Sequence, residues 1–290
     1  MGVLSVIMMN TFREVVRQRL FLLILCLTVA AVAVLLTVPF FTLREDTAMF
    51  KDLSLATVAL AMVFLVALTA SSAVAEELDS KTATTVLVKP VARWQFLVGK
   101  YAGVLLSLLV AMAVLAVVLF ITVYLRVYLD AMPRERQLAF SFSESQPARE
   151  FQALMLNHGL AMFPGAVMIF FQGAVLAAVA VVLSSRFSRV LAVIVTIGLF
   201  LVGHLADFVR LAVEQSSEVV RTGVTWLTGL LPFLETFNIA NKLVHEPLDP
   251  SRPEFAQVWA YTGLSGLYAI GYAAFVLLIG SLLLRQREIP

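Results

Sequence analysis

The sequence has little from which a covalent framework or a metal site could be built. It contains one cysteine, Cys26, inside a long apolar run, so neither an intrachain disulfide nor a cysteine-based metal site can form. The three histidines, His158, His204 and His245, are scattered, and no His-Glu-x-x-His motif provides the spacing of a zinc site. We therefore expect no metal and no cofactor on this chain.

Charged residues are also scarce. They make up 14% of the 290 residues, whereas hydrophobic residues make up 61% and the mean hydropathy is +0.94. A soluble domain has an apolar share of about 45–50%, so this composition predicts an integral membrane protein. The formal net charge of +2 is too small to indicate a nucleic-acid partner.

Long uncharged segments recur along the chain, and a helix needs about 20 apolar residues to cross a bilayer. The pattern predicts an all-α integral membrane protein with one transmembrane domain, residues 1–290. Six transmembrane helices are predicted, at residues 20–38, 53–75, 101–125, 154–185, 190–206 and 255–284. The fourth contains Pro164-Gly165, which predicts a kink or a break there.

The segments outside these spans differ in character. Residues 1–19 place apolar side chains on one helical face and polar ones on the other, which predicts an amphipathic helix lying in the membrane plane. Residues 126–152 and 207–253 are predicted to be external. Within the latter, residues 222–234 are apolar but too short to span, so we expect a re-entrant or interfacial segment between spans five and six.

The distribution of charge predicts the orientation. With six spans, one side of the membrane carries eleven basic and five acidic residues, net +6, and the other carries ten basic and fourteen acidic residues, net −4. Basic residues concentrate in short cytosolic loops. Both termini are therefore predicted to be cytosolic.

The charged stretch at residues 76–100 lies between the second and third spans and has a distinctive order of residues. It resembles the first cytoplasmic loop of type-2 ATP-binding cassette (ABC-2) permeases, in which that loop forms the coupling helix. The residues that carry the resemblance are Glu76, Glu77, Thr82, Leu87, Lys89, Pro90, Arg93, Gly99 and Lys100. Lys81 departs from the pattern, because many members have glycine there.

The resemblance implies a function and partners. This chain would be the permease of an exporter in the cytoplasmic (inner) membrane, paired with a second permease copy, either identical or related, and with two ATPase subunits that hold ATP and Mg²⁺. Glu76, Glu77, Lys81 and Thr82 would contact the ATPase, and Lys89, Pro90 and Arg93 would direct the chain back into the membrane. Residues 1–19 would be the elbow helix of the family.

Other motifs exclude competing functions. No G-x-x-x-x-G-K-[ST] loop is present, so ATP hydrolysis is expected on a partner chain and not here. The span cores lack acidic and basic residues, which disfavours a transporter driven by protons or sodium. Gly263-Leu-Ser265-Gly266 matches an intramembrane protease pattern, but no histidine base follows it, so we interpret it as helix packing. Gly99-x-x-x-Gly103 is likewise interpreted as a packing contact that could also allow a pivot.

Two functions stay open at this point, with an intramembrane enzyme as a distant third. The first is export of a substrate, for which the apolar spans favour a hydrophobic or amphipathic molecule of unknown identity, in contact with membrane lipid. The polar groups available in the spans are Thr69, Ser71, Ser72, Gln172 and Thr196. The second is a mechanical transmitter that uses ATPase work to drive an external, extracytoplasmic partner through residues 126–152 and 207–253.

Overall fold

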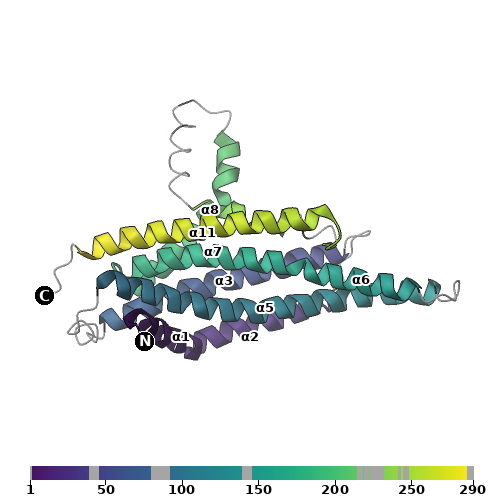
Figure 1. The fold of residues 1–290 in the computed structure, drawn as a ribbon, viewed down its shortest axis with the longest axis horizontal. Helices are drawn as coiled ribbons and strands as arrows, with labels where there is room; N and C mark the ends of the chain where they lie inside the picture. Colours follow the sequence, from purple (N-terminus) through teal and green to yellow (C-terminus); the bar gives the residue numbers. More distant parts are fainter. Residues whose placement is uncertain are drawn as a thin grey trace.

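A computed structural model shows a bundle of long helices arranged along one axis (Figure 1). It describes residues 2–38, 46–79, 92–138, 146–213, 218, 222, 232–240, 243 and 248–285. These residues form α1 (Val3–Arg17), α2 (Arg19–Leu35), α3 (Asp46–Asp79), α5 (Arg93–Leu138), α6 (Gln146–Leu160), α7 (Met162–Ser184), α8 (Arg189–Val213), the 3₁₀ turn η1 (Leu234–Phe237) and α11 (Pro253–Arg285). The described part of the chain contains no strand, which confirms the all-α prediction.

Four helical segments are long and apolar enough to cross a membrane: Thr47–Val74, Trp94–Asp130, Gln152–Ser184 and Pro253–Leu283. They overlap four of the six predicted spans. The helix pair α1 and α2 would add a fifth if it is counted as one span bent by 59°. The stretch Arg189–Leu205 of α8 is apolar but shorter. The described residues thus make a multi-pass membrane protein with four or five candidate spans.

α7 is the central helix of the bundle and contacts α3, α5, α8 and α11. Apart from Gln172 and Ser184 its side chains are apolar, and a helix of this composition is stable only when it is surrounded by other helices or lipid. Small residues let its neighbours approach closely. A Cβ at Gly173, for example, would lie 2.9 Å from the Met62 side chain of α3.

The break in the fourth predicted span falls at Ala161, between α6 and α7. Pro164 lies three residues later, in the first turn of α7. Its ring has no N–H to donate to the carbonyl of Leu160 and would clash with that carbonyl in a continuous helix. The proline is tolerated in the first turn because an N–H there has no partner within the helix.

The helices extend beyond the apolar segments from which the spans were predicted. As a result Lys51, Lys100 and Arg126, which the hydropathy pattern alone assigns to loops, lie on α3 and α5 and are buried. The ammonium of Lys51 donates to the carbonyl of Leu243 at 3.2 Å. The Arg126 guanidinium donates to the carbonyl of Leu36 and to Asp130, both at 3.2 Å. The interactions of Lys51 and Arg126 hold together the bundle end opposite to the end of α3 and the start of α5.

Candidate functional site

The predicted coupling residues fall largely at the edge of the described structure. Glu76 and Glu77 lie in the last turn of α3, and Arg93 is the first residue of α5, but the side chains of all three lie outside the described part. Lys81, Thr82, Lys89 and Pro90 lie entirely outside the described residues. The structure therefore describes the two helix ends that carry the loop and the elements packed against them.

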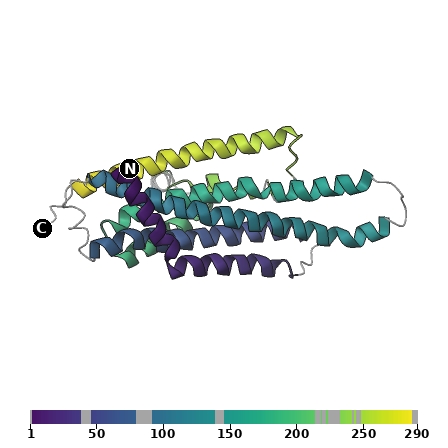
Figure 2. The ribbon, with the colours of Figure 1, turned by 60° about the horizontal axis from the view of Figure 1, so that its bottom comes forward.

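α1 crosses obliquely over the start of α5, directly after this loop (Figure 2). Gly99 and Gly103, one turn apart on α5, face α1. A Cβ at Gly103 would lie 2.6 Å from the Met8 carbonyl oxygen and 2.6 Å from the Cβ of Thr11. At Gly99 it would lie 2.8 Å from the Ile7 side chain. The two glycines allow the two backbones to approach closely, so the packing interpretation of Gly99-x-x-x-Gly103 is confirmed.

An ion pair joins the same two helices. Lys100 Nζ lies 3.6 Å from the Glu14 carboxylate, with 1% of the lysine side chain and 29% of the glutamate side chain exposed. The ammonium also lies 5.9 Å from the centre of the Phe96 ring. Because α1 covers Lys100, its charge is stabilised by α1 and the aromatic ring instead of by bulk water.

The joint between α1 and α2 is tied to α3 as well. Gln18 is the non-helical residue that separates α1 from α2, with φ −65° and ψ 132°. Its side-chain amide donates to the Ser72 hydroxyl at 3.1 Å. Ser72 stands one turn before Glu76 on α3. We use the name α1 junction for Glu14, Gln18, Ser72, Lys100 and Gly103; it connects α1 to both helices that flank residues 80–91.

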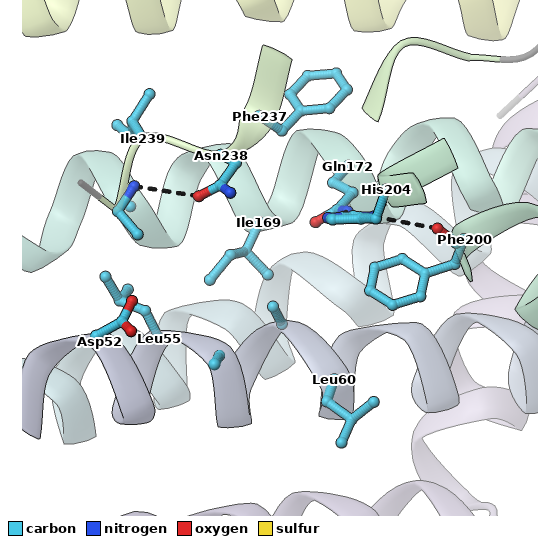
Figure 3. A pocket seen from close by; sticks show the side chains of 14 residues that line it. Asp52, Leu55, Leu60, Ile169, Gln172, Phe200, His204, Phe237, Asn238 and Ile239 are labelled. Carbon is cyan, nitrogen blue, oxygen red and sulfur yellow. Dashed lines mark hydrogen bonds between the residues drawn. The ribbon is translucent and has the colours of Figure 1, made fainter. Parts of the chain in front are cut away.

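A second candidate site is a cavity of about 420 Å³ between α3, α7, α8 and η1. Figure 3 shows the side chains that face it. Asp52 and Asn238 are exposed polar groups of its lining, and Gln172 and His204 are polar groups less exposed to solvent. Most of the remaining lining is apolar and includes Leu55, Leu60, Ile169, Phe200, Phe237 and Ile239. A cavity of this size and mixed lining suits a small amphipathic molecule.

The hydrogen bonds of His204 define its tautomer. Nδ1 lies 3.1 Å from the carbonyl oxygen of Phe200, which can only accept, so Nδ1 carries the proton (Figure 3). Nε2 then accepts from the Gln172 amide nitrogen at 3.3 Å. His204 is therefore a hydrogen-bonded histidine, and no group of metal-binding residues surrounds it within the described structure.

Among the polar side chains in the spans that the sequence offered for contact with a substrate, Gln172 lines this cavity. Thr69 and Thr196 instead donate to carbonyls of their own helices, Leu65 and Ala192, and Ser72 belongs to the α1 junction. The sequence did not predict that Asp52 and Asn238 line this cavity, because their positions relative to each other depend on how η1 packs against α7 and α8.

We expect Gln172→Leu to lower the free energy of unfolding by about 1–3 kcal/mol, because it leaves the His204 Nε2 acceptor without its donor. Gln172→Leu combined with His204→Leu removes both polar partners and should recover most of this loss. Denaturant unfolding in detergent of the two variants and wild type measures the difference. A double variant less stable than the single variant would contradict this pairing.

Comparison with known proteins leaves the family open. No protein-family model matches the sequence, and no curated protein matches it. The assignment of a function therefore depends on the residues and on their geometry.

Proposed function

We propose that this chain is the permease subunit of a type-2 ATP-binding cassette exporter, driven by ATPase subunits that bind the loop at residues 76–93. The α1 junction carries the proposal. A loop pulled by a partner would transmit little motion if its flanking helices moved independently. Here Gln18–Ser72 and Glu14–Lys100 tie α1 to both helices, so a displacement of the loop would move α1, α3 and α5 together.

In this proposal the chain crosses the membrane six times, through α2, α3, α5, α6 with α7, α8, and α11. α1 is the elbow helix, and residues 76–100 carry the coupling helix. Support for the orientation comes from the charge bias and from the arrangement of the bundle: the start of α5 and the ends of α3 and α11 lie at one end, beside α1 (Figures 1 and 2). Residues 126–152 and 207–253 would face the exterior.

The cavity lined by Gln172 and His204 is the proposed contact site for an amphipathic substrate. It lies on the outer side of the proposed membrane core, where Asp52 and Asn238 offer polar contacts beside an apolar wall. A mechanical transmitter would not need this cavity. Ala59 of α3 also lines the cavity. Filling the cavity by Ala59→Phe should therefore reduce export while leaving ATPase stimulation intact, and unchanged export would favour transmission instead.

The ATPase contact is tested directly by charge removal. We expect Glu77→Gln and Arg93→Gln each to weaken binding of the ATPase by about 1.5–3 kcal/mol, the contribution of a hydrogen bond to a charged group. The full chain is purified from native membranes in detergent, and co-purified Mg-ATP hydrolysis is measured. Glu254→Gln and Arg252→Gln remove the same charges at the opposite end of the bundle and serve as controls.

The outcomes separate the hypotheses. Loss of hydrolysis in the loop variants alone supports an ATPase docked at residues 76–93. Equal hydrolysis in the loop variants and the controls would exclude that docking role. Absence of any ATPase with the intact chain would exclude the exporter itself.

A further inference from the structure

The cavity at His204 is covered on one side by residues 232–240, which we call the η1 strap. Figure 3 shows Phe237 and Asn238 of this strap opposite α3, and Ile169 of α7 pointing into the space between them. The other lining residues belong to α3, α7 and α8. Within the described structure α11 contributes no residue to the lining, yet it holds the strap in place.

Two tyrosines of α11 form hydrogen bonds with the backbone at the two ends of η1. The Phe233 N–H donates to the Tyr268 hydroxyl at 2.9 Å, and the Tyr261 hydroxyl donates to the Thr236 carbonyl at 2.8 Å. The tyrosines are seven positions apart, which places both on one face of α11. The Tyr268 ring also lies 6.0 Å from the ring of Phe237, which lines the cavity. α11 therefore positions a cavity wall that it does not itself form.

The contacts that hold this segment differ in their exposure to water. Leu243, three residues after the strap, is 1% exposed, and its carbonyl accepts a hydrogen bond from the buried Lys51 ammonium at 3.2 Å. The two tyrosine hydrogen bonds instead lie at the surface, where water competes for the same groups. The Leu234 and Phe237 side chains of η1 are buried. Lifting η1 exposes them to solvent, so the closed position predominates.

We propose that the η1 strap is a lid that opens the His204 cavity to solvent by pivoting at Leu243, and that Tyr261 and Tyr268 hold it closed. Both tyrosines are positioning residues, because they act on the cavity through the strap. The use of this opening to release an export substrate rests on the exporter function proposed for this chain. In that function, a shift of α11 relative to α7 withdraws both hydroxyls together, because they lie on one helix.

Cysteine labelling of the purified full-length chain in detergent measures the opening without an ATPase or a substrate. Cys26, the only cysteine, is replaced by serine, and Ile169→Cys places one thiol inside the cavity at a position that is 7% exposed. A water-soluble maleimide reacts with this thiol in proportion to the time that the strap is open. Tyr261→Phe with Tyr268→Phe removes both hydrogen bonds and keeps the rings, so we expect labelling to be about tenfold faster. Tyr272→Phe removes a hydroxyl from the neighbouring ring of α11 and should leave the rate unchanged.

A second cysteine position separates opening of the lid from general loosening. Ala166→Cys lies on α7 three residues before Ile169, is 2% exposed and does not line the described cavity. Its labelling should stay unchanged in the tyrosine double variant. An equal increase at both cysteines would mean that the whole bundle loosens, and would overturn the lid. An unchanged rate at Ile169→Cys would overturn it as well. Faster labelling at Ile169→Cys alone, together with unchanged export in Ala59→Phe, would support the lid and exclude its role in export.

Discussion

Replacing Gly103 by alanine is expected to separate α1 from α5. The added Cβ would lie 2.6 Å from the Met8 carbonyl oxygen, and a backbone oxygen cannot rotate away as a side chain can. Overpacking of this kind costs about 1–3 kcal/mol. Alanine is also a better helix former than glycine by about 0.8–1 kcal/mol, which offsets part of the loss. We expect a net destabilisation measured by denaturant unfolding in detergent.

Two other glycines give matched controls for this result. At Gly99 the new Cβ would lie 2.8 and 3.0 Å from Cγ2 and Cβ of Ile7 and 3.6 Å from the Leu4 carbonyl oxygen, so it is less crowded than at Gly103, where it would lie 2.6 Å from a backbone oxygen. At Gly198, within α8, nothing lies within 4 Å. The expected order of stability is therefore Gly198→Ala highest, Gly99→Ala intermediate and Gly103→Ala lowest. A Gly198 variant as unstable as the Gly103 variant would contradict the close approach of α1.

The separation of α1 from α5 can also be measured by limited proteolysis. Arg13 and Arg17 are exposed on α1 and are sites for trypsin. Cleavage there should be faster in Gly103→Ala than in wild type, because a protease cuts segments that open from the fold. Unchanged cleavage with reduced stability would mean that the damage lies within α5 and not between the helices. If the exporter proposal holds, the same variant also loses ATPase coupling.

Hydropathy predicted the helical fold, since runs such as residues 101–125 admit no other structure in a membrane. It did not predict where charged residues near span ends would lie. Lys51 and Arg126 follow or precede apolar runs, and only the packed structure shows that they continue the helices and bind the carbonyls of Leu243 and Leu36. Snorkelling side chains and buried ones have the same sequence signature.

The candidate sites also combine features that the sequence predicted with features that only the structure shows. The packing role of Gly99 and Gly103 was predictable, because small residues four apart mark a close helix contact. Their partner was not, because spacing on α5 says nothing about which helix faces it. The Glu14–Lys100 pair is separated by 86 positions, and Asp52 and His204 line the same cavity only because of the paths of α3 and α8. Contacts between residues so far apart in the sequence can be identified only from the folded structure.

We expect the largest loss of stability from Glu14→Gln. Comparing the stability of this variant with that of Lys100→Met tests the ion pair. Glu14→Gln leaves the Lys100 ammonium, 1% exposed, without its carboxylate. Removing one partner of a buried pair costs about 3–5 kcal/mol, and the 29% exposure of Glu14 makes this an upper bound here. Lys100→Met removes the buried charge and keeps the volume. The carboxylate that remains can be hydrated, so this variant should lose less.

The double variant Glu14→Gln with Lys100→Met completes the cycle. Because this variant no longer contains the buried Lys100 ammonium, it should be more stable than Glu14→Gln alone, although it carries one further substitution. Unfolding of all four proteins under one detergent condition gives the coupling energy. Additive losses would contradict the pair, and equal losses in the two single variants would contradict the difference in burial. A double variant that folds stably but no longer stimulates an ATPase would show that the Glu14–Lys100 connection transmits motion as well as stabilising the fold.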